Sequence, residues 1–319
     1  MELKSRPASE LTADQLAALI SLAFSNYVAG PLKFAGDTVT RYVRTNHVDL
    51  ARSHVFYDAS TSSSSDGSGG EDLAFALIAT REDRPRDARL AAFGVVPAAQ
   101  GRGVGRRAVE AVIEAERARG TKVLELEVIT ANAAGVKLYE RTGFAVVREL
   151  YAWERPAEEV YRAPTPPEGE EDKGEELREC TVEEVSRLVK GDAEAGELSF
   201  QAYLFADNPS SQLALRRGHA YAVISDPAAG DDDGTITVMT LFVEPGHRGK
   251  GEAAGLMRAV LERYAGENGG EKGEGQQQQR KKWIAKAWFD RSVGEGLARS
   301  AGFGKYHLSQ YLMRRDLTP

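Results

Sequence analysis

The chain has 319 residues and a formal net charge of −7 at pH 7, and this length predicts about two domains. The negative charge argues against nucleic acid as the main partner. No apolar run approaches the length of a membrane-spanning helix, so we expect no membrane partner. Cys180 is the only cysteine, which excludes a disulfide within the chain and favours a reducing, cytoplasmic compartment.

The sequence pattern of the N-terminal region predicts three strands and one amphipathic helix. Leu3 to Ala8 has the length of a strand, and apolar residues recur at helical spacing over Thr12 to Asn26. Ser53 to Ala59 and Asp72 to Thr80 are expected to form paired strands. The serine- and glycine-rich residues 60–70 between these strands have low complexity and are expected to form a loop.

Arg89 to Phe144 is the most informative stretch of the chain. An apolar run closed by Pro97 has strand length, and the glycine-rich turn Gln100 to Gly105 precedes an amphipathic helix. Lys122 to Ile129 predicts a second strand, and Asn132 is a good N-cap for the short helix that follows. Strand, turn, helix, strand and helix make a βαβα unit, so the two strands are expected to be parallel.

The glycine-rich turn is suited to bind an anion. Alternate glycines let several backbone N–H groups point into one concavity, at the positive end of the following helix. A P-loop would need Lys and Ser or Thr after its last glycine, but Gly105 is followed by Arg106 and Arg107. A dinucleotide-binding turn would need a glycine at Arg106. An NTPase or a nucleotide-binding oxidoreductase is therefore disfavoured, although the glycines would also suit a plain strand-to-helix turn.

The turn fits a different pattern, Gln/Arg-x-x-Gly-x-Gly/Ala, through Gln100, Gly103 and Gly105. This pattern resembles the pyrophosphate-binding loop of the GNAT acyl-CoA N-acyltransferases. More features of that family follow in order: a Val-x-Pro-type corner, a strand glutamate, an asparagine, a tyrosine and a closing Leu-Tyr-x-x-x-Gly-Phe. They are found here as Val95-Val96-Pro97, Glu127, Asn132, Tyr139 and Leu138 to Phe144.

The resemblance implies an α/β (α+β) fold with two tandem GNAT-like domains. Each domain would contain a mixed, mainly antiparallel twisted sheet flanked by helices, with a central parallel pair of strands splayed around a cleft for coenzyme A. Acetyl-CoA would be the cosubstrate, and no metal would be needed. The residues implied to bind acetyl-CoA are Phe93, Gly94, Val95, Gly101, Arg102, Gly103, Val104, Gly105, Arg106 and Asn132.

The resemblance also implies roles for two catalytic residues. Glu127 would accept a proton from the attacking amine, and Tyr139 would donate one to the departing thiolate. Glu125 and Glu127 share one strand face, and two like charges with partial burial would raise the pKa of Glu127. The alternatives are that both glutamates form a solvated face and that Tyr139 packs in the core. For Tyr27, a place in the acceptor pocket and a place in the core both stay open.

The second half of the chain repeats the plan of the first. A second glycine-rich loop follows Pro245, which aligns with Pro97. This loop has Arg248, Gly251 and Ala253 where the first has Gln100, Gly103 and Gly105. The positions of Glu127, Asn132 and Tyr139 hold Lys286, Arg291 and Ala298 instead. The second copy thus keeps the loop pattern and lacks the candidate acid and base.

We therefore predict a catalytic GNAT domain over residues 1–158, an acidic linker rich in Pro, Glu and Gly over 159–175, and a degenerate GNAT-like domain over 176–319. The predicted activity is direct transfer of an acetyl group from acetyl-CoA to a primary amine of a small molecule. Acetylation of a protein N-terminus or lysine is the alternative within the enzyme class. A non-catalytic acyl-CoA-binding or interaction module is the alternative of another class, and the chain is expected to be a monomer or a homodimer.

Overall fold

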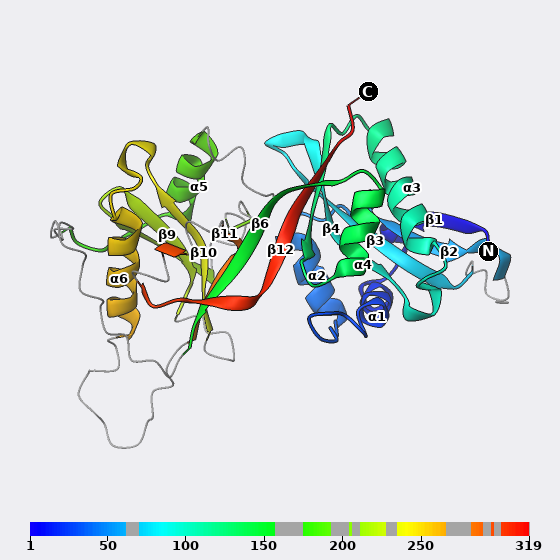
Figure 1. The fold of residues 1–319 in the computed structure, drawn as a ribbon, viewed down its shortest axis with the longest axis horizontal. Helices are drawn as coiled ribbons and strands as arrows, with labels where there is room; N and C mark the ends of the chain where they lie inside the picture. The colour runs from blue at the N-terminus through cyan, green and yellow to red at the C-terminus, as the bar shows by residue number, and fades with distance from the viewer. Residues whose placement is uncertain are drawn as a thin grey trace, which may run out of the picture. The chain divides into compact units, whose positions relative to one another are not determined.

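The computed structural model describes residues 1–61, 70–156, 175–192, 204–205, 211–227, 235–265, 282–289, 295–296 and 301–318. The chain divides into two compact units (Figure 1). The first unit contains Met1–Arg148 and Gln310–Pro319, and the second contains Glu149–Ser309. In the ranges described, no helix is both long enough and apolar enough to cross a membrane.

The first unit is a mixed sheet with helices. Its strands lie in the order β1-β2-β3-β4-β5-β12, and every neighbouring pair is antiparallel except the parallel pair β4 and β5. Helix α1 packs against α2, and α3 packs against β3, β4 and α4. In chain order the elements are β1 (Leu3–Pro7), α1 (Ala13–Ala23), α2 (Gly36–Thr45), β2 (His54–Asp58), β3 (Asp72–Arg81), β4 (Arg84–Val95), α3 (Val104–Ala118), β5 (Val123–Ile129), α4 (Ala133–Arg141) and β12 (Gly304–Asp316).

Local sequence signals explain where these helices begin and end. The Thr12 hydroxyl accepts the Gln15 N–H at 3.2 Å and the Gln15 side chain accepts the Thr12 N–H at 2.8 Å, a capping box that starts α1. Gly120 takes a left-handed φ of 81° just beyond the end of α3. The core is centred on β3, where Leu73 to Ala79 are at most 4% exposed, so this strand is buried on both faces.

The second unit repeats this architecture. Its strand order is β6-β11-β10-β9-β8-β7, with β10 and β11 as the parallel pair. Separate buried clusters join α6 and α5 to the sheet, and the alternating burial of β10 shows that its side chains point to opposite faces. In chain order the elements are β6 (Ala145–Arg155), β7 (Arg178–Cys180), α5 (Val182–Gly191), β8 (Gln212–Arg217), β9 (Ala220–Ser225), β10 (Thr235–Val243), α6 (Glu252–Ala265) and β11 (Lys282–Phe289).

The predicted fold, two GNAT-like α/β units each with a central parallel pair, is confirmed, but the sequence analysis missed two strands. It did not identify β8, which lies between α5 and β9 in the chain. It also did not identify β12. The predicted linker 159–175, except for Glu175, lies outside the described residues, as does most of the loop 60–70.

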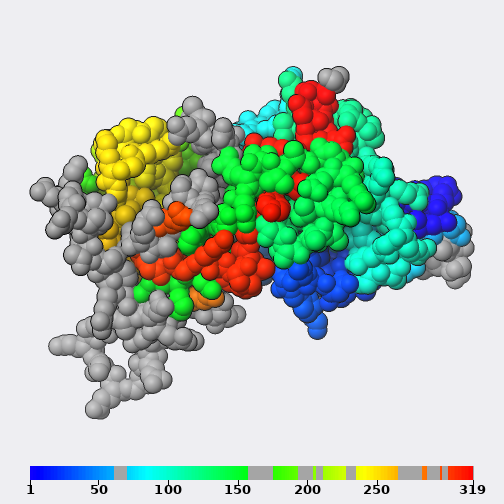
Figure 2. Space-filling model, viewed as in Figure 1, coloured from blue at the N-terminus to red at the C-terminus, as the bar shows by residue number. Residues whose placement is uncertain are grey.

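The units differ from the predicted domains in their last strands. Strand β6 follows α4 in the chain, yet from Glu149 onward it belongs to the second unit and pairs with β11. Strand β12 ends the chain, and from Gln310 onward it belongs to the first unit and pairs with β5. In Figure 2 the C-terminal end of the chain, in red, lies among the blue-green residues of the first unit. Each unit is therefore completed by a strand from the other half of the sequence.

Candidate active site

The glycine-rich turn of the first unit presents open backbone at the start of α3. Gly101 and Gly103 have φ angles of 72° and 78°, a region that favours glycine. Gly103 is the N-cap of α3 and no side chain caps the helix. A Cβ atom at either glycine would meet no atom within 4 Å. The first N–H groups of α3 are therefore free of side-chain partners in a space that an anionic group can enter.

The other predicted loop residues have different surroundings. Val104 is fully buried and belongs to the core, so only its backbone can contact a ligand. A Cβ at Gly105 would lie 3.5 Å from Leu138 and Val95, an ordinary contact distance. Arg102 is exposed, and Arg106 forms an exposed ion pair with Glu110 one helical turn later. Both arginines are near the loop and have room to move toward an anion.

The end of β4 borders an opening in the sheet. Strands β4 and β5 pair only from Asp87 to Arg89 on β4, so beyond Arg89 the two parallel strands diverge. The Val96 N–H donates to the Leu73 carbonyl of β3 at 2.9 Å. Because successive N–H groups of a strand point to opposite edges, the Val95 N–H points away from β3 and into this opening.

Side-chain packing fixes the same segment. The Gln100 amide donates to the Val95 carbonyl at 3.0 Å, which ties the glycine-rich turn to the end of β4. At Gly94, a Cβ would lie 2.7 Å from the Phe75 ring and 2.9 Å from Ala23, so the close approach of these residues requires glycine. Phe93 is partly buried, and its ring lies beside that of Tyr139 with centroids 6.4 Å apart.

Glu127 lies on β5 beyond Glu125, the last residue of this strand that is paired with β4. Its side chain is only 2% exposed. The Arg89 guanidinium donates from Nε to Oε2 of Glu127 at 2.8 Å, and the Arg89 side chain is 3% exposed. Burial raises the pKa of the Glu127 carboxyl, Arg89 opposes the rise and Glu125 adds to it. The predicted direction of the pKa change is confirmed, but burial is its main cause.

The sequence analysis did not identify the arginines on this face. The Arg314 Nε donates to Glu125 at 3.0 Å, and that carboxylate is 8% exposed. The two glutamates therefore do not form a solvated face, because both side chains are buried, each beside an arginine. The signal for Arg89 was its place directly before the apolar run that begins at Leu90.

Tyr139 lies on α4 and is 8% exposed. Its ring contacts Phe93 and Phe144, with centroids 6.4 and 5.8 Å away. Burial, with a smaller contribution from Tyr27, raises the pKa of the Tyr139 hydroxyl above its ordinary value. That hydroxyl makes no hydrogen bond within the described part of the chain. Tyr139 thus packs among aromatic rings and keeps a hydroxyl available as a donor.

Asn132 has a structural role in α4. Its side-chain oxygen accepts the Gly135 N–H at 3.0 Å and caps the helix. The side-chain NH₂ group still has donors for a further partner. The predicted contact between Asn132 and a bound cofactor is therefore compatible with its capping role, and it stays a prediction.

The second unit reproduces the conformation of the loop. Gly249 and Gly251 have φ angles of 74° and 80°, and Arg248 donates to the Val243 carbonyl at 3.1 Å as Gln100 does to Val95. The predicted alignment of the two loops is confirmed by this geometry. Of the three substituted positions, Arg291 and Ala298 lie outside the described residues, and the side chain of Lys286 is not described.

Charged side chains distinguish the second loop from the first. The rings of His219 and His247 stack with centroids 3.4 Å apart. The Nδ1 atom of His219 lies 3.1 Å from Glu244, and that of His247 lies 3.3 Å from Glu252. Glu252 stands at the start of α6, where the first unit has Val104. Its carboxylate competes with an anionic ligand for the positive end of that helix.

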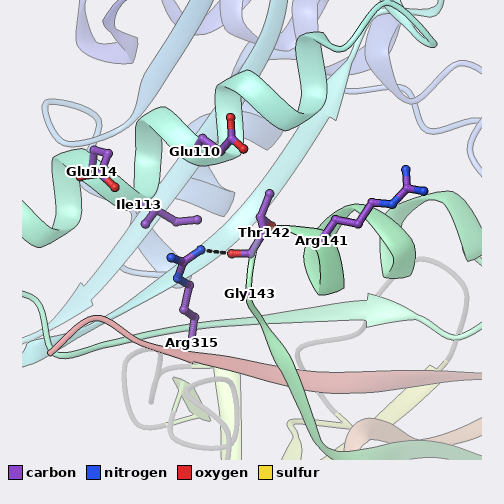
Figure 3. Close-up of a pocket in the computed structure, with 7 residues that line it drawn as sticks. All are labelled: Glu110, Ile113, Glu114, Arg141, Thr142, Gly143 and Arg315. Carbon is purple, nitrogen blue, oxygen red and sulfur yellow. Dashed lines mark hydrogen bonds between the residues drawn. The ribbon is translucent and has the colours of Figure 1, made fainter. Parts of the chain in front are cut away.

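A surface pocket of the first unit shares no residue with the predicted site. It is lined from α3, the end of α4 and β12 (Figure 3). Arg315 donates to the Thr142 carbonyl, while Glu110 and Arg141 point away from Arg315. The pocket therefore lacks convergent polar groups, and we assign it no role. In the described ranges, no three His, Cys, Asp or Glu side chains are placed to hold a metal ion.

Comparison with known proteins agrees with this geometry. Residues 44–144 match the family described as Acetyltransferase (GNAT) family. A curated relative, a mycothiol acetyltransferase of Propionibacterium freudenreichii subsp. shermanii, is 40% identical over 70 residues, and the match covers 22% of this chain and 22% of the relative.

Solved structures match over nearly the full length. A GCN5-related N-acetyltransferase from Sphaerobacter thermophilus has a TM-score of 0.65 and 17% identity, over 99% of this chain and 96% of that one. A tandem GNAT protein from the clavulanic acid biosynthesis pathway has a TM-score of 0.60 and 15% identity, over 100% and 99%. Residues 44–144 therefore match the GNAT family, and the solved structures show that the chain has the fold of two GNAT-like units in tandem.

Proposed function

We propose that the first unit transfers an acetyl group from acetyl-CoA directly to a primary amine of a small molecule. The observation that carries the proposal is the open glycine turn at the uncapped start of α3, next to the opening between β4 and β5. Three further observations support it: the GNAT match over residues 44–144, the buried Glu127 at this opening, and the relative named as an acetyltransferase.

Each residue of the site has one task in this proposal. The N–H groups of Gly101 to Arg106 would hold the pyrophosphate, and the Asn132 amide would bind the pantetheine arm. Bound acetyl-CoA would supply the thioester carbonyl that the amine attacks. The Val95 N–H would donate to the carbonyl oxygen as negative charge develops there.

Proton movements complete the reaction. The new C–N bond forms as the C–S bond breaks, and Glu127 accepts the proton that the amine loses. Because its side chain is only 2% exposed, we propose that this proton passes through one bridging water. Tyr139 donates a proton to the departing thiolate. No covalent enzyme intermediate is required, and the free Cys180 lies in the second unit.

The proposal is tested with purified full-length protein and acetyl-CoA. Glucosamine, spermidine, an amino acid amide and a peptide with a free N-terminus and a lysine serve as acceptors. We expect thiol release faster than without protein for at least one small amine, with the acetylated product identified by mass spectrometry. Turnover of the peptide alone would favour protein acetylation. Binding of acetyl-CoA without turnover of any amine would favour a non-catalytic module.

The two glycine loops provide a matched pair of variants. Gly103→Ala should weaken acetyl-CoA binding and turnover by about tenfold or more, because the new methyl group occupies the space for the anion. Gly251→Ala imposes the same backbone strain, since the two φ angles are 78° and 80°, yet it should leave turnover near the wild-type value. Calorimetry with acetyl-CoA and steady-state rates measure both effects. Turnover lost in Gly251→Ala and kept in Gly103→Ala would assign the reaction to the second unit.

Tyr139→Phe should lower kcat by about tenfold to a hundredfold, and more than it raises the KM for acetyl-CoA, because the hydroxyl acts on the departing thiolate. The raised pKa of Tyr139 means that its protonated, donating form persists below that value and is lost only above it. We therefore expect no fall in kcat from this group up to about pH 10. Tyr57→Phe, outside the site, is the control. An unchanged kcat in Tyr139→Phe would remove this donor from the mechanism.

A further inference from the structure

We propose that Arg89 is a positioning residue that holds the Glu127 carboxylate at the opening of the sheet and sets the pH range over which it can accept a proton. This inference rests on the proposed role of Glu127 as the base. Arg89 lies on β4 and Glu127 on β5, and the Nε to Oε2 distance is 2.8 Å. Neither side chain is more than 3% exposed, so water screens their interaction very little.

Strand pairing explains why this contact forms. Arg89 is paired with Glu125 at the last position where β4 and β5 are in register. Glu127 is the next residue on the same face of β5, where the strands have begun to diverge. On the other side of β5, the residue opposite Glu127 is the apolar Leu312 of β12. The Arg89 guanidinium therefore bridges the start of the opening and gives the Glu127 carboxylate a fixed orientation.

Arg89 is the cation paired with Glu127, and Glu125, Arg314 and Tyr42 are further charged or titratable groups around this pair. Glu125 has its own partner, Arg314, at 3.0 Å. From α2, the Tyr42 hydroxyl donates to the Ala91 carbonyl at 2.8 Å. The Nη1 atom of Arg89 is buried and makes no hydrogen bond within the described part of the chain. Among the acidic groups around it, the Arg89 guanidinium interacts most strongly with Glu127, and less strongly with Tyr42 and Glu125.

The consequence is a balance of two opposing effects. Burial raises the pKa of Glu127, and the guanidinium of Arg89 opposes that rise. An opposite charge at this distance typically lowers a carboxyl pKa by about 1–3. Without Arg89, Glu127 would keep its proton to higher pH, and the pH range over which it can act as a base would move upward. Arg89 would then act on the reaction without contacting a substrate.

The direct test is an infrared titration that needs no acceptor. Full-length protein with ¹³C-labelled glutamate carboxyl groups is titrated, and the signal of Glu127 is isolated by subtracting Glu127→Gln. In Arg89→Met, whose signal is isolated with Arg89→Met/Glu127→Gln, we expect the midpoint to rise by about 1–3 pH units. Arg89→Lys keeps the charge and should show a smaller rise, so it carries the test if Arg89→Met does not fold.

The control variant is Arg314→Met, which removes a cation from the same face but not from Glu127. Because Arg314 pairs with Glu125 and not with Glu127, the Glu127 midpoint should rise less than in Arg89→Met. A Glu127 midpoint that is unchanged in both Arg89 variants would overturn the inference. So would an equal rise in Arg314→Met, because that result would show a general effect of lost positive charge.

Kinetics separate this inference from the proposed function. With an amine that the wild type acetylates, the acid limb of the kcat/KM profile should move upward in Arg89→Met by the same amount as the infrared midpoint. In the Glu127→Gln background, Arg89→Met should cause no further loss of rate. Full wild-type rate in Glu127→Gln would reject Glu127 as the base. A shifted infrared midpoint would still support control of its protonation by Arg89.

Discussion

Deletion of Gln310 to Pro319 is expected to unfold the first unit and abolish acetyl transfer. This segment supplies the edge of the first unit's sheet, from Gln310 opposite Ile129 to Asp316 opposite Val123. Within it, Leu312 and Met313 are fully buried and Leu317 is 2% exposed. Its loss would expose the apolar side chains of β5, unpair the β5 backbone and leave Glu125 without Arg314.

The effect should be confined to one unit, because residues 149–309 stay intact in the truncated chain. Hydrogen exchange followed by mass spectrometry should show lost protection in β3 and β5 and retained protection in β9 and β10. Deletion of only Thr318 and Pro319 is the control, because it spares the bond from the Leu317 N–H to the Lys122 carbonyl. Leu312→Ala is a milder change to the same strand and should lower the free energy of unfolding by about 2–5 kcal/mol. Wild-type protection of β5 in the ten-residue deletion would contradict this account.

The same reasoning applies to a fragment that ends at the predicted domain boundary. A Met1–Glu158 fragment lacks the strand that pairs with β5 in the full chain. It also contains residues 149–155 of β6, which belong to the second unit. We therefore expect this fragment to be less stable than the first unit of the full-length protein. Its denaturant midpoint, compared with that of the full chain, is the measurement.

Glu127→Gln should lower kcat by about 100-fold or more at neutral pH, within the usual range for a positioned acid or base. The amide cannot accept the proton of the amine, whereas the loop that is proposed to hold acetyl-CoA is unchanged, so the affinity for acetyl-CoA should stay near the wild-type value. Because the pKa of Glu127 is raised, wild-type activity should fall as the pH drops through that raised value. The acid limb should therefore lie above the ordinary range of a glutamate.

Glu125→Gln is the matched control for this prediction. Glu125 lies on the same face of the same strand, it is nearly as buried as Glu127, and it too has an arginine partner. If loss of a buried charge were the whole effect, both variants would lower kcat equally. We expect Glu125→Gln to retain most of the activity, and its acid limb should move downward because Glu125 no longer raises the Glu127 pKa. Equal losses in the two variants, or a wild-type pH profile in Glu127→Gln, would contradict a specific role for Glu127.

The sequence by itself determined the features that depend on local backbone chemistry. Left-handed glycines at Gly101, Gly103, Gly249 and Gly251 and the Asn132 cap follow from what each residue type permits in its own turn. Their repeated order revealed two copies of one plan and the GNAT pattern. Glu127 and Tyr139 were found in the same way, because the family's spacing fixes their places on a strand and a helix.

Only the tertiary structure decided which distant residues meet. The Arg89 and Glu127 pair spans 38 residues and the Arg314 and Glu125 pair spans 189, and no local periodicity encodes such a pairing. The places of β6 and β12 also lay beyond sequence reasoning. The two halves share one plan, so the sheet of either unit offers a similar edge to each of these two strands. The strand's own pattern does not select between the two edges. Packing over the whole chain sets the pairing partner.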